Sequence, residues 1–507
     1  MTKNKIVNLK DLKKYSDSQR KSKKKIILAH GTFDLLHIGH IKHLTFAKKN
    51  ADILIVTITA DKFVKKGPDR PVFKQENRAE MLAALEIVDK ICIINSPSAI
   101  EAIENVKPDY YVKGIEYKNT KNDITKKISK EISILKKNKG KIIYSNDETF
   151  SSSNLINNFF SHRTNEQKQK LKMIGKRNIL KKIINDENRI SKLKICIIGD
   201  TIFDIYRFVS PMGKSPKENV ITNQFINEKR FAGGVLAAAN NLSSFCNNIE
   251  IITHCYNTKI EKNFVFKSLN KKIKITNFKN IKNPVTKKIR YIENGFNRKL
   301  FSIYEMDDNI SKGKYETQII SYLKNKLKKF DLVIAADFGH GFISENIIKC
   351  LEKNSKFLSV NAQSNSANHG FNLITKYNRA NYICIDLPEA KLAVKNKFAT
   401  PLEIATKLLP KTNKFKYFSL TLGKNGSLIC KDKSTFELDS LTKNVIDTMG
   451  AGDVFFVLTS VFVYLKYNIE EIALIGNTAG CLKVNILGHE KTIKKEDFYS
   501  LIKSALM

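Results

Sequence analysis

The sequence predicts an α/β protein made of two domains, each built around a mainly parallel sheet. Its 507 residues are more than one ordinary hydrophobic core organises, and its 42% hydrophobic content is that of a globular chain. Short β-branched runs alternate with helical segments in two separate regions. We therefore expect a basic lead-in over residues 1–24, a first domain over 25–160, a basic helical linker over 161–192 and a second domain over 193–507.

The expected strands follow one another at intervals that leave room for a helix between them, as in β-α-β units. In the first domain they are "KIILA", "ADILIVTIT", "KICIIN", "DYYVKG" and "KIIYS". In the second domain they are "KICIIGD", "IEIIT", "DLVIAAD", "KFLSVN", "YICID" and "KYFSLTLG". The segment between the domains is polar and basic with little to bury, which is why it is predicted to be a linker.

The net charge of +39, from 88 Lys and Arg against 49 Asp and Glu, raises the question of a polyanionic partner. A nucleic-acid-binding protein would gather this charge on one face and place exposed aromatic residues among it. Here the excess is spread along the whole chain, so we expect a general compositional bias and no specific nucleic acid. Phosphorylated small substrates would be attracted by the same charge.

Three features predict a cytoplasmic protein. No apolar run reaches 18 residues, and the longest, over 454–465, suits a buried helix, so no membrane partner is expected. The N-terminal residues lack the apolar stretch of a secretory signal. The eight cysteines are scattered without a C-x-x-C pair, which favours reduced, buried thiols.

The first motif with chemical content is "GTFDLLHIGHIKHL", residues 31–44. A strand ends, a glycine turn follows, and a helix is expected to open near Ile38. His37 and His40 are three residues apart, so they face the same way at the helix N-terminus, where free backbone N–H groups and the positive dipole end also lie. Two imidazoles and free amides there suit the charge that develops on an α-phosphate during nucleotidyl transfer.

A zinc site is the alternative interpretation of these histidines. It would need at least a third protein ligand, and no cysteine is near. Only His30 and His43 could serve, but His30 closes the preceding strand and His43 is expected on the helix surface. The thin ligand set makes the metal site the weaker hypothesis.

"GTFDLLHIGH" resembles the signature of the H-x-G-H nucleotidyltransferases, a cytidylyltransferase-like group with a Rossmann-like fold. "RPVFKQENRAEML", "KPDYYVKGIEY" and "FSSSNLI" follow in the order seen in the adenylyltransferase half of the bifunctional ADP-heptose enzymes. The resemblance implies that His37 and His40 stabilise the transition state. It also implies a set of nucleotide-binding residues: Thr32 and Phe33 in the cradle, Lys42, Arg78 and Lys113 at the phosphates, and Ser151, Ser152 and Ser153 at a helix start facing the triphosphate. The three basic residues are explained equally well as solvated charges.

The letters "HIGH" also belong to the class I aminoacyl-tRNA synthetases, and "KMIGK" (172–176) is distantly like the second lysine motif of that class. The four-letter match is weak. The residues after "KMIGK" begin another α/β domain, so we set the synthetase interpretation aside.

The second motif is "DTMGAGDVFF", in which a glycine turn starts a helix and an aspartate follows at once. Glycine amides can surround a transferring phosphoryl group, and Asp453 can accept a proton from an attacking hydroxyl. This motif resembles the ribokinase-like sugar kinases, as do "IGDTIFDIY", "AGGVLAAANNL", "ADFGHGF" and "TLGKNG" in order. The resemblance implies that Asp453 is the base, with these further roles: Gly450, Ala451 and Gly452 as anion hole, Asp204, Gly233 and Gly234 at the sugar, Glu389 ordering Mg²⁺ through water, and Gly423 near adenine.

Three departures from the kinase pattern concern the sugar end. The family's sugar-binding Asn is Ala237, its Asp-Pro-Lys is Asn361-Ala362-Gln363, and the Asn of its Asn-x-x-Glu is Asp386. The order of the domains is also the reverse of the familiar bifunctional enzyme. These departures leave open which sugar is bound and whether the second domain turns over.

The sequence thus predicts a bifunctional enzyme of ADP-heptose-like synthesis in lipopolysaccharide core assembly. It would phosphorylate a sugar phosphate with ATP and Mg²⁺ and transfer a nucleotidyl group, expected to be AMP, onto a sugar 1-phosphate. The enzyme is expected to be a homodimer. One alternative is a transferase that uses CTP with glycerol 3-phosphate or another polyol or sugar phosphate. The other is that the kinase-like domain only binds ligand and serves in regulation or dimerisation.

Overall fold

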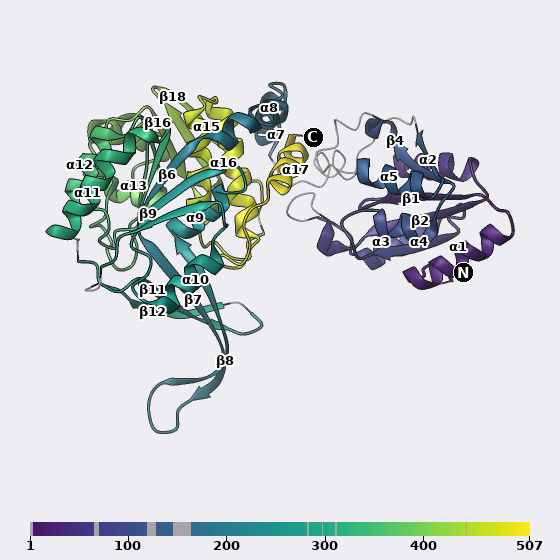
Figure 1. The fold of residues 1–507 in the computed structure, drawn as a ribbon, viewed down its shortest axis with the longest axis horizontal. Coiled ribbons are helices and arrows are strands. Elements are labelled where there is room, and N and C mark those ends of the chain that lie inside the picture. The colour runs from purple at the N-terminus through teal and green to yellow at the C-terminus, as the bar shows by residue number, and fades with distance from the viewer. Residues whose placement is uncertain are drawn as a thin grey trace. The chain divides into compact units, whose positions relative to one another are not determined.

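The chain forms two units (Figure 1), one of residues 1–175 with 499–507 and one of residues 176–498. Both are α/β, so the predicted fold class is confirmed. Within the part described, no helix has the length and apolar character needed to cross a bilayer. The structure is a computed structural model that describes residues 4–64, 70–118, 128–145, 164–280, 283–296, 298–309, 312–442 and 444–506.

The first unit contains a five-stranded, fully parallel sheet in the Rossmann-like order β3-β2-β1-β4-β5. The chain moves from β1 to β2 on one side and later places β4 on the other side. Ligands of such sheets bind outside the carboxyl ends of the strands at this reversal. The strands are β1 (Ile26–Gly31), β2 (Ile53–Thr59), β3 (Lys90–Ile94), β4 (Tyr110–Gly114) and β5 (Lys141–Ser145).

Helices cover both faces of this sheet and bury a separate core on each. One core includes residues of α1 (Leu9–Lys21), α4 (Ile100–Val106) and α5 (Ile128–Lys137). The other includes residues of α2 (Ile38–Lys49) and α3 (Gln75–Ala83). Because the sheet is buried on both sides, its strands are continuous apolar runs, as the sequence indicates.

The lead-in over residues 1–24 is more than a solvated segment. Asn8 caps α1 by accepting a hydrogen bond from the backbone N–H of Asp11, and Leu12 is fully buried in the first core. One apolar residue per helical turn was too weak a signal among so many lysines to predict this packing.

The expected linker also differs from the prediction. It contains α7 (Asn165–Gly175), which belongs to the first unit, and α8 (Ile179–Lys192), which belongs to the second. Helix α8 buries three isoleucines, Ile179, Ile183 and Ile190, and its Lys182 forms an ion pair with Glu471 of α16. The isoleucines at helical spacing form an apolar face. Helix α8 therefore packs against the rest of the second unit, whereas the sequence predicted that this segment had little to bury.

The second unit contains a nine-stranded sheet in the order β10-β9-β6-β13-β14-β15-β16-β17-β18. The strands from β10 to β16 are parallel, and the last two add antiparallel pairs at the edge. Its strands are β6 (Lys194–Gly199), β9 (Asn248–Thr253), β10 (Ile273–Asn277), β13 (Leu332–Asp337), β14 (Leu358–Ala362), β15 (Tyr382–Asp386), β16 (Tyr417–Thr421), β17 (Ser427–Lys431) and β18 (Ser434–Leu438).

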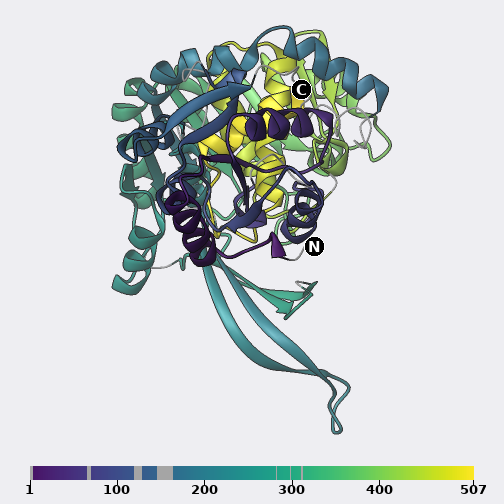
Figure 2. The same ribbon diagram turned by 90° about the vertical axis from the view of Figure 1, so that its right-hand side faces the viewer.

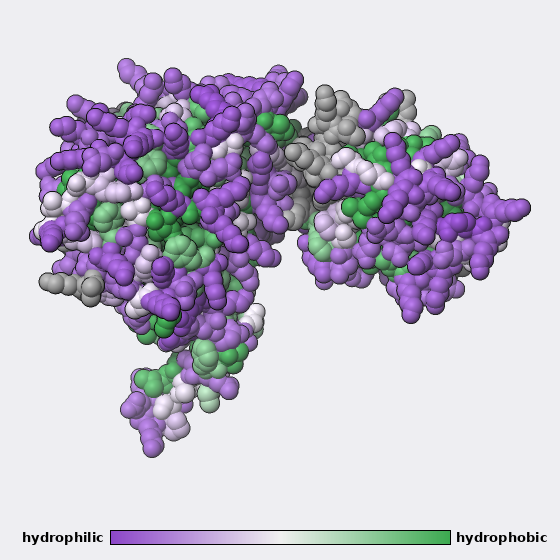
Figure 3. All heavy atoms as spheres, in the orientation of Figure 1, coloured by the Kyte–Doolittle hydropathy of each residue, from purple (hydrophilic) through white to green (hydrophobic). Residues whose placement is uncertain are grey.

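A separate four-stranded sheet, in the order β12-β11-β7-β8, carries a long two-stranded ribbon that projects from this unit (Figures 1 and 2). The ribbon is made of β7 (Thr201–Lys214) and β8 (Ile221–Gly234), beside β11 (Thr286–Glu293) and β12 (Arg298–Glu305). Apolar side chains are exposed on its outer half, as the green patches of Figure 3 show: Met212, Val220, Ile221, Phe225 and Ile226.

The helices of the second unit enclose its large sheet. Two buried ones, α15 (Ala451–Tyr464) and α16 (Ile469–Val484), pack against each other and carry the "DTMGAGD" turn at the start of α15. The remaining helices are α9 (Val235–Leu242), α10 (Lys259–Ser268), α11 (Lys314–Lys326), α12 (Glu345–Asn354), α13 (Leu387–Ala393), α14 (Pro401–Glu403) and α17 (Lys495–Leu506), the last of which is divided between the two units.

Candidate active sites

The paired histidines of the first unit lie at the sheet reversal, directly after β1. His37 is the N-cap of α2, and its Nδ1 accepts a hydrogen bond from the backbone N–H of Gly39 over 3.1 Å. The His37 and His40 rings stack with centroids 3.9 Å apart and planes 27° apart. The sequence therefore correctly predicted that the two imidazoles lie together at a helix start.

Phe33 packs against His40 of this pair. It is 5% exposed, belongs to the apolar core, and meets the His40 ring edge-on with centroids 5.1 Å apart. Its backbone φ is +48°, in the left-handed region that few non-glycine residues adopt. A Cβ on Gly31 would come within 3.1 Å of the Phe33 ring, so a larger residue there would crowd that ring.

Arg78 was expected at the nucleotide phosphates, but its side chain lies inside the fold. Its side chain is fully buried, and its guanidinium donates hydrogen bonds to the carbonyl oxygens of Thr32, Thr59 and Phe73 and to Asp61 Oδ1, over 2.5 to 3.0 Å. A guanidinium with its N–H groups used in this way is a structural clamp. It fixes the carbonyl of Thr32, so Thr32 is held by its backbone.

A second arginine clamp was missed by sequence reasoning. Arg70 pairs with Asp34 over 2.9 Å, and both side chains are buried. Asp34 Oδ1 also accepts the backbone N–H groups of Val72 and Phe73. The Asp of "GTFD" thus ties the histidine turn to the segment before α3, and the spacing of 36 residues hid this contact.

The other predicted residues of the first site are dispersed. Lys42 is exposed on α2. Lys113, at the end of β4, directs its ammonium toward the carbonyl oxygen of His30 at 3.4 Å and lies 3.8 Å from Glu131. Ser151, Ser152 and Ser153 lie outside the described residues.

The two histidines considered as extra metal ligands have other contacts. His43 is half-buried, and its Nδ1 lies 2.7 Å from Ser145 Oγ at the end of β5, so it is not the surface residue that was expected. His30 Nδ1 lies 2.9 Å from Thr57 Oγ1. Among the described residues no group of three or more potential ligands could hold a metal ion.

In the second unit the sugar-side residues gather around a buried ion pair. Asp204 on β7 lies 2.5 Å from Arg290 on β11 and 3.5 Å from Nε2 of His489. Burial alone would raise the pKa of Asp204, but the hydrogen bond from His489 and the charge of Arg290 hold it at about 2. Asp204 is therefore ionised at any working pH.

Both predicted glycines are required by close backbone approach. A Cβ on Gly233 would lie 2.1 Å from Asp204 Oδ2, and one on Gly234 would lie 2.4 Å from the carbonyl oxygen of Asp200. Gly234 also has φ +59°, a conformation that favours glycine. Ala237, on α9, is buried and offers no side-chain donor, so the departure at this position persists in the structure.

The "DTMGAGD" turn opens α15 as predicted. Gly450 is the N-cap with φ +72°, and Asp453 is the third residue of the helix. The side chain of Gln363, at the end of β14, donates a hydrogen bond to Asp453 Oδ1 over 2.5 Å. Burial raises the pKa of Asp453, against the opposing charge of His489 and this hydrogen bond. A carboxylate with a raised pKa at a helix start is suited to accept a proton.

Asp447, just before the turn, was not singled out from the sequence, yet it joins the turn to the small sheet. Its carboxylate accepts hydrogen bonds from Lys299 on β12, Tyr206 on β7 and the backbone N–H of Gly488, each over 2.8 Å. Burial would raise the pKa of Asp447, but these partners hold it at about 2. The turn and the small sheet are thereby fixed to each other.

Glu389 and Asp386 form a reciprocal cap at the start of α13. Glu389 Oε2 accepts the backbone N–H of Asp386, its Oε1 accepts that of Ser364, and Asp386 accepts the N–H of Glu389. Burial, reinforced by the charge of Asp386, raises the pKa of Glu389 to about 8. A cation bound near these two carboxylates would stabilise their ionised forms, so the pair is suited to a cation site. Gly423, after β16, is exposed with open space around it and φ +58°.

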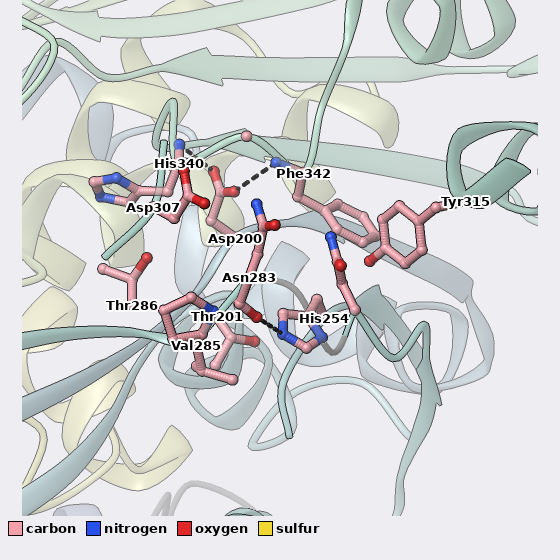
Figure 4. Close-up of a pocket in the computed structure, with 13 residues that line it drawn as sticks. Asp200, Thr201, His254, Asn283, Val285, Thr286, Asp307, Tyr315, His340 and Phe342 are labelled. Carbon is pink, nitrogen blue, oxygen red and sulfur yellow. Dashed lines mark hydrogen bonds between the residues drawn. The ribbon is translucent and has the colours of Figure 1, made fainter. Parts of the chain in front are cut away.

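A small cavity of about 30 Å³ lies at the carboxyl end of β6 (Figure 4). Asp200 lines this cavity, and its carboxylate accepts hydrogen bonds from the backbone N–H groups of His340 and Phe342 over 3.3 and 3.1 Å. Asp307 adds a second carboxylate to the lining. The volume exceeds the roughly 10–15 Å³ that one water needs, but two carboxylates make it a poor place for a phosphate.

Family profiles match the two α/β regions of the chain. The profile of the cytidylyltransferase-like family matches residues 28–159, and that of the pfkB family carbohydrate kinases matches residues 192–493, more than half of the chain. The chain belongs to the pfkB family of carbohydrate kinases. This pfkB kinase region follows a cytidylyltransferase-like domain.

The curated relatives match only part of the protein. The chain is 40% identical over 132 residues to the bifunctional protein HldE of a Nitratiruptor species, covering 26% of this chain and 28% of that protein. It is 42% identical over 119 residues to HldE of Campylobacter fetus, covering 23% and 25%. The match thus spans about a quarter of each relative, and the domain order is reversed relative to HldE.

Solved structures support the fold of the kinase region. The tetrameric inhibited form of phosphofructokinase-2 from Escherichia coli aligns with a TM-score of 0.50 at 11% identity, covering 62% of this chain and 99% of that one. Ribokinase from Thermotoga maritima aligns with a TM-score of 0.47 at 18% identity, covering 61% and 99%. At such identities a likeness concerns the fold alone, and of these two alignments the phosphofructokinase-2 one supports it.

Proposed function

We propose that the chain is a bifunctional enzyme that phosphorylates a sugar phosphate in its kinase unit and transfers a nucleotidyl group in its first unit. The observation that carries the kinase half is Asp453, whose burial raises its pKa and which follows the Gly450–Gly452 turn at the start of α15. The first half is supported by the stacked His37 and His40 at the start of α2.

In the kinase step, Asp453 accepts the proton of a sugar hydroxyl as that oxygen bonds to the terminal phosphorus of ATP. The bond from this phosphorus to ADP breaks, and the N–H groups at the helix start offset the charge on the moving phosphoryl group. Asp204 accepts hydrogen bonds from sugar hydroxyls. Its fixed ionisation and the glycines beside it support this role, and the exposed loop at Gly423 is the proposed adenine side.

Magnesium fits the acidic pair at the start of α13. Glu389 and Asp386 would hold it through water, as Mg²⁺ usually keeps several waters and few carboxylates. When bound, the ion neutralises charge on the ATP phosphates. The raised pKa of Glu389 supports this placement, because a cation nearby would stabilise its ionised form.

In the nucleotidyl step, the phosphate of a sugar 1-phosphate attacks the α-phosphorus of ATP and pyrophosphate leaves. His37 and His40 donate hydrogen bonds to the α-phosphate as its charge grows. Lys42 and Lys113 are proposed to neutralise the remaining phosphates. Arg78 is left out of this set because it is fully buried and four hydrogen bonds within the fold already use its guanidinium.

We propose a heptose 7-phosphate as the kinase substrate, AMP as the transferred group, and a nucleotide-activated heptose for lipopolysaccharide core as the product. The support is the partial likeness to HldE. A cytoplasmic site of action is consistent with eight cysteines that are all free and buried. We also propose a homodimer, formed by pairing of the apolar β7–β8 ribbons, because patches of this kind mark interaction surfaces.

Two alternatives are favoured by particular observations. The cytidylyltransferase-like match favours CTP with glycerol 3-phosphate or another polyol or sugar phosphate. Ala237, which offers no donor to a sugar, favours a kinase unit with altered specificity or a purely regulatory one.

A panel assay tests the proposal. ATP or CTP is incubated with candidate sugar phosphates, and ADP and pyrophosphate are followed separately. ADP formed with a sugar phosphate and pyrophosphate formed from ATP with a sugar 1-phosphate are the expected results. Pyrophosphate from CTP alone would overturn the adenylyl assignment, and no ADP with any sugar would leave the kinase unit as a regulatory domain.

A further inference from the structure

Lys483 is a fully buried lysine of the kinase unit that neither proposed step uses. It lies in the last turn of α16, and none of its surface is exposed. Burying an ammonium group costs several kcal/mol unless nearby charge or hydrogen bonds compensate it. A lysine kept in such a place therefore points to a use for its charge.

The side chain lies directly behind the phosphoryl-binding turn. A Cβ placed on Gly450 would lie 3.3 Å from Cε of Lys483 and 2.7 Å from Cε1 of His489. Lys483 Nζ donates a hydrogen bond to the carbonyl oxygen of Gly488. Among the described residues, its other two N–H groups have no hydrogen-bond partner, and no carboxylate lies within ion-pairing distance of it.

The backbone next to Lys483 holds the start of the turn. The carbonyl oxygen of Val484 accepts the N–H groups of Ile446 and Asp447 over 2.8 and 3.0 Å. The end of α16 therefore holds the start of the turn in place. The Lys483 ammonium group places a positive charge next to that turn.

Three carboxylates and three cationic or titratable side chains surround this position. Asp204 forms ion pairs with Arg290 and His489, and Asp447 forms one with Lys299. Asp453, by contrast, accepts its hydrogen bond from the neutral amide of Gln363 and forms no ion pair in the described part of the chain. Burial lowers the pKa of Lys483 while its nearby acids, Asp447, Asp453 and Asp204, oppose that change. The remaining charged groups near Asp453 are Lys288 and Glu389.

We propose that Lys483 is a positioning residue of the phosphoryl-transfer site, supplying from behind the Gly450–Gly452 turn the positive charge that balances Asp453 and the arriving phosphoryl group. It touches neither the sugar nor the phosphate and acts through the turn. This inference rests on the proposed kinase activity. It explains why an ammonium without a carboxylate partner is retained in a buried helix.

Lys483→Met tests the proposal, because methionine fills similar space without charge. With the sugar that gives ADP, we expect kcat to fall by about tenfold or more, with a small change in the sugar KM. We also expect the acidic limb of the pH–rate profile to move up by about one pH unit, as loss of a nearby positive charge raises the pKa of a carboxylate. Lys483→Arg, which keeps the charge, should restore much of kcat and the position of the limb.

Lys182→Met is the matched control. It removes from α8 an ammonium that pairs, over 2.7 Å, with buried Glu471 near the other end of α16. It should lower Tm and leave the acidic limb where it is. If Lys483→Met does not fold, Lys483→Ala is assayed with n-propylammonium or n-propanol, and rescue by the amine alone is expected.

An unshifted limb with unchanged kcat in Lys483→Met, or a Lys483→Arg variant as impaired as Lys483→Met, would overturn the inference. So would equal rescue of Lys483→Ala by amine and alcohol. Absence of ADP with the unmodified enzyme would instead contradict the kinase activity itself, so the two failures are distinguishable.

Discussion

The amide of Gln363 donates a hydrogen bond to the carboxylate of Asp453 over 2.5 Å, joining the end of β14 to the start of α15. Gln363 is one of the positions at which the chain departs from the kinase pattern. The departure therefore changes the environment of the proposed base itself. A hydrogen bond to the ionised form of an acid lowers its pKa, so Gln363 favours the form of Asp453 that accepts a proton.

Gln363→Ala is expected to raise the pKa of Asp453, because it removes a donor to the ionised carboxylate while burial remains. Since the base works in its ionised form, the acidic limb of the ADP-forming rate should move to higher pH. Gln363→Glu should move it further by adding a like charge. The measurement is kcat against pH for all three proteins; a limb in the same place in each would contradict this account.

Changing the two proposed sites separately should separate the two reactions. His40→Ala should abolish pyrophosphate release and leave ADP formation intact, because it removes one donor of the stacked pair. Asp453→Asn should do the reverse by removing the base. Losses of about a hundredfold or more are expected for each. Both activities falling together in either variant would be incompatible with two independent sites.

Arg78→Ala should destabilise the protein, whereas Lys42→Ala should not. Removing the Arg78 guanidinium leaves three backbone carbonyls and Asp61 without their donor, which is expected to cost about 2–4 kcal/mol. Lys42 is exposed, so its loss should instead weaken nucleotide binding. Denaturant unfolding and nucleotide KM distinguish the two; equal stability of both variants would contradict the clamp.

The stability of the kinase unit should depend on pH and Mg²⁺ through Glu389. Its pKa in the fold is about 8, above the ordinary value of 4.5, so the folded protein binds more protons than the unfolded one between these values. Stability is then expected to fall as pH rises from about 4.5 to 8. Mg²⁺ with ATP should reduce this slope. Thermal unfolding of the unmodified chain and of Glu389→Gln measures it, and the same slope in both would exclude Glu389 as the cause.

Charges placed on the projecting ribbon should prevent self-association. Phe225 is 58% exposed and Met212 is 68% exposed. We expect Phe225→Lys with Met212→Lys to give a monomer by sedimentation with both activities retained in the first assay, because the ribbon projects out from the body of its own unit (Figure 2). Lys262→Ala, on α10, serves as a control. A monomeric unmodified protein would contradict the proposed dimer.

The sequence was sufficient for those site features that are local. The stacked histidines and the glycine turn before Asp453 depend on neighbours within a few residues, and the helix starts that hold them follow from glycine and capping chemistry. The inner strands of the five- and nine-stranded sheets were equally readable because they are buried on both faces and give continuous apolar runs. The exposed strands of the four-stranded sheet, such as β8 and β12, lack such runs and were not predicted.

Features that depend on distant pairs could not be read in this way. Arg78 is a basic residue on a helix, and only its packing shows that its donors are used inside the fold. Lys299 and Asp447 are 148 residues apart, and no local pattern joins them. His43 was expected on the surface because its partner, Ser145, lies 102 residues away.

Asp447 has a consequence for how the kinase unit admits its substrates. Its carboxylate is held at once by Lys299 and Tyr206, from two strands of the small sheet, and with a pKa of about 2 it stays charged wherever the enzyme works. These hydrogen bonds tie the small sheet to the phosphoryl-binding turn. Sugar and nucleotide should therefore enter a site whose walls are already set, and ligand binding should change the dimensions of this unit very little.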